Sequence, residues 1–123
     1  MWMVNPHFMC NQHLLGEHGE IHLHRHNFVK QHSIRGRIEP VVQIEPMAMK
    51  VRHDRLAVEM TLRGMNHKSP YEMPDISYLP DEHRLATVCI PISVRDLSQR
   101  CQECRKLLNA HLSEQYNDPN LLR

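Results

Sequence analysis

Apolar residues near the amino terminus recur with the period of a helix. Three of them lie seven residues apart, and at about 100° per residue they share one face: Leu14, Ile21 and Phe28. Asn5 is a good N-cap residue, and Pro6 suits the first helical position because the N–H that proline lacks has no helical partner there. The pattern predicts a helix from about residue 6 to residue 30 that buries its apolar face.

Titratable side chains lie beside this stripe on the same predicted helix. Four of them fall on one narrow face by the same angular rule: His13, Glu17, Glu20 and His24. A carboxylate at the border of a core can have its pKa tuned by burial and by neighbouring charges. Carboxylate chemistry on this helix is therefore a functional hypothesis that the residues themselves support.

Two glycines lie beside the acidic face of this predicted helix. Gly16 and Gly19 each weaken a helix by about 0.5–1 kcal/mol relative to alanine. One explanation is that they let a DNA backbone, or the amino terminus of the chain itself, approach closely. The other explanation is a close crossing with a second helix.

The rest of the chain predicts two further helices joined by irregular segments. Apolar residues at helical spacing indicate helices at about 47–63 and 93–114, and Gly64 is placed to follow the C-cap of the first. Prolines and a glycine break any regular period in 31–46, and prolines do so in 69–80.

Two local signals refine the carboxyl-terminal half. Residues 86–90 look like one short strand that Pro91 ends, and the segment 93–96, Ser-Val-Arg-Asp, has the form of a capping box at the start of the last helix. Other strand signals are scarce. We therefore expect an all-α fold, with one compact domain over residues 1–123, about three principal helices and long irregular loops.

Composition is that of a globular protein. The hydrophobic fraction of 41% and the charged fraction of 24% are ordinary for a folded domain. No apolar run reaches the roughly 20 residues that a membrane span requires, and the first residues lack a signal-peptide pattern. We expect a cytoplasmic protein with reduced cysteines and no membrane partner.

The net charge of +1 argues against a strong nonspecific grip on nucleic acid, which depends on Lys and Arg. The charge is unevenly distributed. Residues 1–68 contain nine Lys and Arg against six Asp and Glu, together with nine of the eleven histidines, whereas residues 69–123 contain six against eight. The amino-terminal half is the better candidate for phosphate contacts, although a solvated surface explains the same imbalance.

Cysteine spacing raises the question of a metal site. Cys101 and Cys104 have the spacing of half a zinc site, which Cys89 and His111 would have to complete. Cys101 and Cys104 also fall on the apolar stripe of the last predicted helix, where two buried structural thiols are the interpretation we favour. No phosphate-binding loop or dinucleotide motif is present, and we expect no cofactor.

Two blocks of this sequence occur in the same order in a known family. The first is Gln12-His13-Leu14 with Glu17 and Glu20. The second is the run 52–60 followed by Arg63-Gly64-Met65-Asn66-His67-Lys68-Ser69-Pro70. They resemble the catalytic helix, and the second helix with its following turn, of the pyrimidine-dimer DNA glycosylases of the phage endonuclease V type. The resemblance covers about residues 1–70 and includes Trp2 and Pro6.

The resemblance implies a DNA-repair glycosylase with abasic-site lyase activity, acting on pyrimidine dimers or another damaged or modified base in double-stranded DNA. The amine of Met1 would attack the sugar C1′ and form an imine. Glu20 would stabilise the cationic sugar and assist proton removal from C2′, and His13 would help to build the site. An α-amine suits this role because its ordinary pKa of about 7.7–8 leaves it partly neutral in cells. Bulky Trp2 disfavours removal of the initiator methionine, so we expect Met1 to be retained.

The family's best-known member has arginines at two positions that are Gly19 and Leu23 here, so phosphate contacts must come from elsewhere. We expect them from five residues of the amino-terminal half: His22, His24, Arg25, Arg35 and Lys68. The missing arginines and the low net charge favour one alternative, a noncatalytic helical protein of this descent that binds DNA or another protein. A zinc-binding interaction module is the other alternative.

Overall fold

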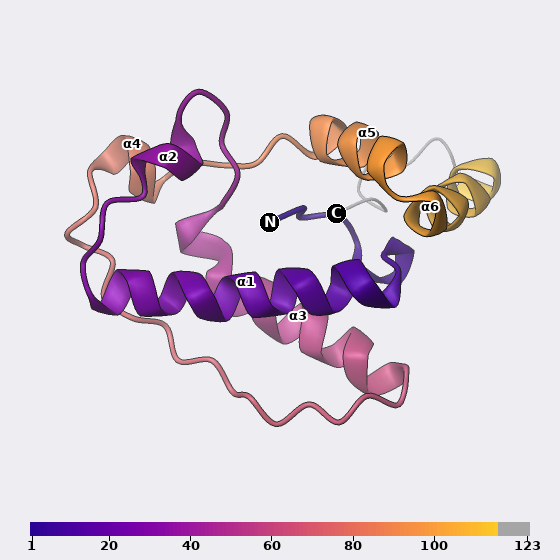
Figure 1. Cartoon of the computed structure of the whole chain (residues 1–123), viewed down its shortest axis with the longest axis horizontal. Coiled ribbons are helices and arrows are strands. Elements are labelled where there is room, and N and C mark those ends of the chain that lie inside the picture. The colour runs from indigo at the N-terminus through magenta and orange to yellow at the C-terminus, as the bar shows by residue number, and fades with distance from the viewer. Residues whose placement is uncertain (116–123) are drawn as a thin grey trace.

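The computed structural model describes the backbone of residues 1–115 and the side chains of residues 1–110. Its elements in chain order are η1 (Pro6–Phe8), α1 (Asn11–Val29), α2 (Arg35–Ile38), η2 (Pro46–Ala48), α3 (Met49–Leu62), α4 (Asp81–Arg84), α5 (Ile90–Arg100) and α6 (Gln102–Gln115). The described residues contain helices and no strand, which confirms the all-α prediction (Figure 1). Within the same residues, no helix combines the length and the apolar character needed to cross a membrane.

The apolar stripe of the first helix lies at the centre of the core. Leu14 and Ile21 are fully buried and Phe28 is 1% exposed, as their spacing predicts. The helix begins later than predicted, because Asn5 caps only the short 3-10 helix η1, and α1 starts at Asn11 after extended backbone at Cys10. α1 packs against α3, and η1 contacts both α3 and α6.

Helix α3 ends as the sequence predicts. Gly64 follows the C-cap with φ +80, a left-handed conformation that glycine adopts without steric cost. The N–H of Gly64 donates to Thr61 O at 3.0 Å, and the N–H of Met65 donates to Met60 O at 2.9 Å. These two bonds satisfy carbonyls at the helix end and form a Schellman motif. The loop that follows, residues 65–80, runs back along α1, where Arg25 Nε donates to Glu72 O at 2.7 Å.

The carboxyl-terminal half differs from the prediction in two places. Residues 86–89 have no regular secondary structure, and Pro91 lies in the first turn of α5 instead of ending a strand. The predicted capping box is also wrong, because Ser93 is inside the helix and 6% exposed. Proline is favoured in a first helical turn for the same reason that it ends a strand, since it has no N–H to donate.

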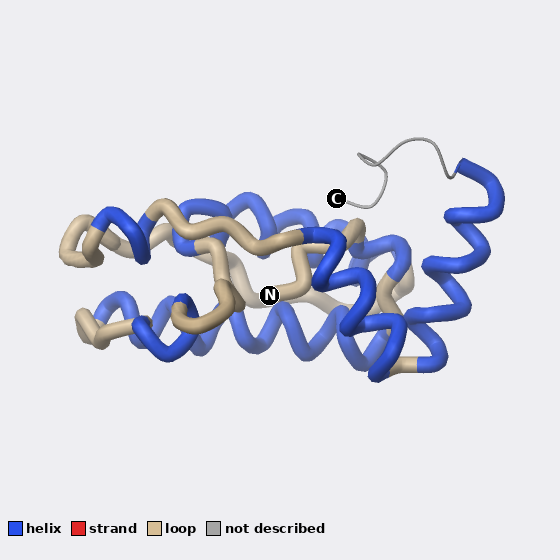
Figure 2. The backbone as a smooth tube through the Cα atoms, turned by 90° about the horizontal axis from the view of Figure 1, so that it is seen from above, coloured by secondary structure: helices blue, strands red, loops and turns tan. Residues whose placement is uncertain are grey.

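The predicted helix 93–114 is two helices. Cys101 has extended backbone (φ −133, ψ 113) between α5 and α6, so residues 1–115 form four long helices and not three. Helical spacing continues across this break, and the sequence pattern therefore gave no sign of it. The break lets the chain turn, so that α5 and α6 pack against each other (Figure 2).

Neither glycine of α1 is required by packing within the chain. A Cβ atom placed on Gly16 or on Gly19 meets no atom within 4 Å in the described structure. The helix-crossing explanation is therefore wrong, and so is a close approach of the amino terminus to these glycines. Both face open space, which leaves the approach of a DNA backbone as the remaining prediction.

Candidate active site

The amino-terminal nitrogen is held between α1 and the loop before η2. Met1 N donates to Glu20 Oε1 at 3.0 Å and to the carbonyl oxygen of Gln43 at 2.8 Å. The Met1 side chain is buried, and its sulfur accepts a hydrogen bond from Glu45 N at 3.4 Å. Two acceptors and a buried side chain therefore fix the position of the amine.

Two carboxylates one helical turn apart hold the first two residues of the chain. Glu20 contacts the amine of Met1, and Glu17 Oε1 accepts from the backbone N–H of Trp2 at 3.0 Å. The chain then turns at Met3, a non-glycine residue with a left-handed φ of +59. Such a conformation is uncommon outside glycine, and here it leads the chain from the site toward η1.

Glu17 is fixed by a buried ion pair with α3. Its two carboxylate oxygens accept from Arg52 Nε at 2.5 Å and from Arg52 Nη2 at 3.0 Å, and both side chains are almost fully buried. A bidentate pair of this kind sets direction as well as distance. The pair links α1 to α3 at the point where Trp2 is held.

Glu20 is poised to carry a negative charge. Burial alone would raise its pKa, but the hydrogen bond from His24 and the positive amine of Met1 lower the pKa to about 2. His24 Nε2 lies 3.3 Å from Glu20 Oε1, and the His24 side chain is 2% exposed. Its Nδ1 has no hydrogen-bond partner among the described residues, which favours the tautomer that carries its proton on Nε2.

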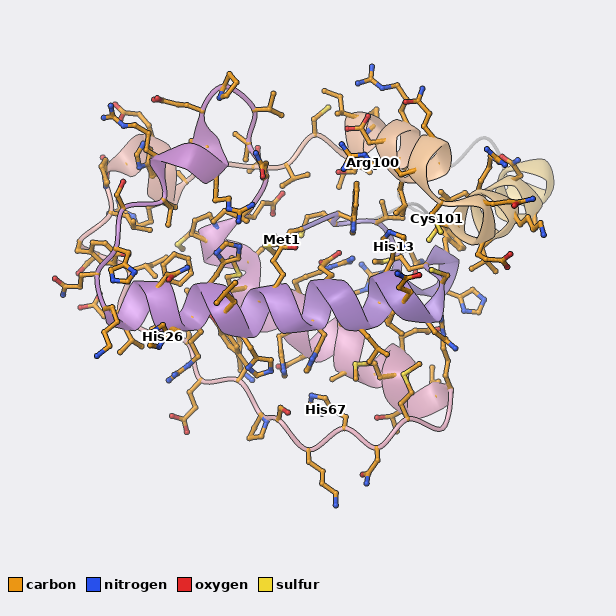
Figure 3. All side chains as sticks on the ribbon, in the orientation of Figure 1. Met1, His13, His26, His67, Arg100 and Cys101 are labelled. Atoms are coloured by element: carbon orange, nitrogen blue, oxygen red, sulfur yellow. The ribbon has the colours of Figure 1, made fainter. Side chains whose placement is uncertain are left out.

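The amine and Glu20 face an open pocket of about 790 Å³. Its lining residues include Met1, Trp2, Glu20, Arg37, Gln43 and Arg100. The volume lies within the usual range of ligand pockets, about 300–1,000 Å³. Met1 and Arg100 lie on the same side of α1 (Figure 3), and the first residues run between α1 and the segment that leads into α5 (Figures 1 and 2). A polar group of a ligand in this pocket can reach the amine and the carboxylate together.

The structure brings together two of the three predicted catalytic residues. Met1 and Glu20 are in contact, as the resemblance implies, although their catalytic roles stay predictions. His13 lies elsewhere, with its Nδ1 3.2 Å from Cys10 Sγ and its ring edge-on to Trp2 at a centroid distance of 6.0 Å. It contributes to the site through Trp2, which lines the pocket.

The five predicted DNA contacts do not share one surface. His24 is buried behind Glu20, and Arg25 is bound to the carbonyl of Glu72. His22 packs against other rings, including Tyr71, at a centroid distance of 6.0 Å. Lys68 follows His67, which lies across α1 from Met1 and Arg100 (Figure 3).

Arg35 lies nearer the pocket, in the short helix α2. Its neighbour Arg37 lines the pocket and donates to Gln43 Oε1 at 3.2 Å. Arg35 itself is exposed and lies 4.0 Å from the Glu39 carboxylate. Arg100 also lines the pocket and lies over the Trp2 ring, 6.0 Å from its centroid. Sequence reasoning missed both Arg37 and Arg100 as pocket residues. For Arg37, its position two residues after the predicted contact Arg35 was a sign that could have been used; for Arg100 there was none.

Two clusters have the residue types and spacing of metal ligands. One contains Cys10, His13, Cys101 and Cys104, and the other contains His18, His53 and His67; in each cluster the ligand atoms lie within 4.8 Å of one another. Cys89, one of the residues expected to complete a zinc site, is exposed and outside both clusters. The other, His111, has a side chain outside the described part of the chain.

Comparison with known proteins adds one finding. No curated protein and no solved structure matches the chain. The family model for pyrimidine dimer DNA glycosylases matches residues 1–73, from the amine of Met1 through α1 and α3 to the loop beyond. Because this match covers more than half of the 123 residues, the chain belongs to the pyrimidine dimer DNA glycosylase family.

Proposed function

We propose that this protein is a DNA glycosylase with abasic-site lyase activity, acting on pyrimidine dimers or a related damaged base in duplex DNA. Met1 supplies the nucleophile and Glu20 the catalytic carboxylate. The observation that carries the proposal is the 3.0 Å contact between the terminal nitrogen and Glu20 Oε1 at the wall of an open pocket. A nucleophile beside a group that accepts its proton is the usual arrangement for covalent catalysis.

The reaction follows from these two groups. The neutral amine attacks C1′ of the damaged nucleotide, the C1′–base bond breaks, and its electron pair leaves with the base, which takes up a proton. Opening of the sugar ring gives an imine between Met1 N and C1′. Loss of a proton from C2′ then expels the 3′ phosphate by β-elimination and breaks the strand.

Glu20 suits the steps of this reaction in which the sugar carries a positive charge. The pKa of Glu20 is lowered from its ordinary 4.5, so the carboxylate is ionised near neutral pH and faces the cationic sugar as base departure proceeds. Preorganised charge in a site partly shielded from water is a large catalytic term. Glu20 also accepts a hydrogen bond from Met1 N, so it lies where a proton leaving C2′ of the bound sugar can be received.

The pocket suits a nucleotide that has left the helical stack. Unstacking costs a few kcal/mol, and damage to the base reduces this cost. Arg37 and Arg100, which both line the pocket, can contact the phosphates of that nucleotide, and exposed Arg35 can contact the backbone beside it. The open faces of Gly16 and Gly19 leave room for a strand along α1. His22, Arg25 and Lys68 stay predicted contacts of the flanking duplex.

Borohydride reduction of the imine tests the proposal. Incubation with duplex DNA that carries a pyrimidine dimer or an abasic site, in the presence of borohydride, is expected to give a covalent adduct that peptide mapping assigns to Met1. Intact mass should show that Met1 is present in the protein used. Undamaged duplex of the same sequence should give no adduct.

Selective transamination of the terminal amine to a carbonyl is the matched control, because it spares the lysines. The treated protein should lose trapping while it keeps its fold. Binding to damaged duplex without any adduct, before and after treatment, would establish the noncatalytic alternative and refute the enzyme.

A further inference from the structure

The four-residue cluster Cys10, His13, Cys101 and Cys104 lies outside the pocket and takes no part in the proposed reaction. Its ligands come from three places: the N-cap and first turn of α1, the break between α5 and α6, and the first turn of α6. We propose that these four side chains bind one structural zinc ion. The proposal does not depend on the glycosylase function.

The spacing of the ligand atoms fits a tetrahedral zinc site. With Zn–S near 2.3 Å and Zn–N near 2.0–2.1 Å, a tetrahedron places two sulfurs about 3.8 Å apart and a sulfur and a nitrogen about 3.6 Å apart. Cys10 Sγ lies 3.7 Å from Cys101 Sγ. His13 Nδ1 lies 3.2 Å from Cys10 Sγ and 3.7 Å from Cys104 Sγ. Three cysteines and one histidine form a closed set of four ligands, which is typical of structural zinc sites.

Backbone N–H groups point at the sulfurs as they do around thiolates. The N–H of Cys10 donates to Cys104 Sγ at 3.2 Å, and the N–H of Cys104 donates to Cys101 Sγ at 3.4 Å. Such backbone hydrogen bonds stabilise the charge on a metal-bound thiolate and orient it. The cluster therefore has both the ligands and the supporting donors.

The zinc site also explains the break in the last predicted helix. Cys101 leaves helical geometry although the apolar spacing continues through it. The extended backbone at this position accompanies a turn that brings Cys101 and Cys104 to the start of α1. Zinc binding replaces the thiol protons of three cysteines and couples metal affinity to folding. The ion would hold α5 and α6 against the segment of the chain that the glycosylase family model matches, which ends at residue 73.

Zinc at the cluster would also stabilise one side of the pocket. Arg100 precedes Cys101 directly and lies over the Trp2 ring, and His13 packs on the same ring. Zinc at the cluster would hold in place both residues that contact the Trp2 ring, His13 and Arg100. Trp2 follows Met1, which carries the amine. His13 is then a positioning residue, not a group that touches substrate.

Metal analysis of the full chain tests the proposal. Protein purified without chelator, or refolded with ZnCl₂, is expected to contain one zinc per chain, and Cys101→Ser and Cys104→Ser are each expected to lose it. Cys89→Ser is the matched control, because Cys89 is a free cysteine outside the cluster, and its zinc content should equal that of the wild type. His67→Gln tests the histidine cluster and should also keep the zinc.

A second measurement does not depend on whether the cysteine variants fold. Wild-type protein loaded with Co²⁺ should show the intense visible bands of a tetrahedral site and thiolate-to-cobalt charge transfer in the near ultraviolet. Absence of bound zinc after reloading, or a cobalt spectrum without charge transfer, overturns the assignment. So does a zinc ion that survives Cys101→Ser but is lost in His67→Gln.

Discussion

Replacing Glu20 with Gln is expected to lower the rate of strand cleavage at a damaged site by about 10²–10⁴-fold, the usual contribution of a positioned acid or base. The amide keeps the size of the side chain and can still accept a hydrogen bond from Met1 N, so the pocket should keep its shape. The charge opposite the sugar is lost. Single-turnover cleavage of abasic duplex measures the effect on the lyase step, and cleavage of dimer-containing duplex measures both steps.

Asp96→Asn is the matched control for this substitution. Asp96 lines the same pocket and lies 3.4 Å from Arg95 Nε, but it does not contact the amine. Loss of charge there should change cleavage far less than loss of charge at Glu20. Equal effects of the two variants, or full activity of Glu20→Gln, would remove Glu20 from the mechanism.

Comparison of the wild type with Glu20→Gln also gives a pH test. The folded-state pKa of Glu20, about 2, is below its ordinary value of 4.5. The ionised carboxylate therefore stabilises the fold fully above pH 4.5, and this contribution is lost as the pH falls from 4.5 to 2. The free energy of unfolding of the wild type should exceed that of Glu20→Gln above pH 4.5, and the difference should narrow below it. A difference that stays constant to pH 2.5 would contradict the shifted pKa.

Replacing Arg52 with Met destabilises the protein by about 3–5 kcal/mol, because it leaves the buried Glu17 carboxylate without its partner. The melting temperature should fall by roughly 10–20 °C. Urea unfolding followed by circular dichroism measures the change. Lys50→Gln is the control: Lys50 pairs with Asp54 at 2.8 Å on an exposed surface, and removing such a pair changes stability by at most about 1 kcal/mol.

A double variant separates stability from the placement of the amine. Glu17→Leu together with Arg52→Met removes both charges, and apolar replacement of a buried pair is often neutral or stabilising. The double variant should therefore regain much of the stability lost by Arg52→Met alone. Unlike Arg52→Met, it lacks the acceptor for the Trp2 N–H, so its cleavage rate should fall below that of the wild type. If the double variant recovers both its stability and the wild-type cleavage rate, Glu17 has no part in holding the amino terminus.

Local physics explains the elements that sequence reasoning predicted well. The stripe of Leu14, Ile21 and Phe28 is buried because helical spacing alone puts these residues on one face. Gly64 ends α3 because only glycine adopts its left-handed φ without cost. In both cases the cause lies within a few residues of the effect.

The interpretations that failed depended on distant partners. Helical spacing runs through Cys101, and only the approach of Cys10 and His13 from the other end of the chain distinguishes this residue from an ordinary stripe position. The five DNA contacts stay predictions; they were chosen by charge, and charge does not indicate on which side of α1 a loop will run. Arg100 lines the pocket because of the way α5 packs, and α5 lies outside residues 1–73, which the family model matches.

The sequence by itself determined an all-helical chain, the buried face of its first long helix, the glycine end of α3, and a resemblance that singled out Met1 and Glu20. Only the tertiary structure decided that the terminal nitrogen reaches the carboxylate, that Arg52 neutralises Glu17, and that three cysteines and a histidine converge. The reason is the separation of the interacting residues along the chain. Periodicity and capping act over one or two turns, whereas these contacts join residues 19, 35 and 91 positions apart, and their geometry exists only once the core has packed.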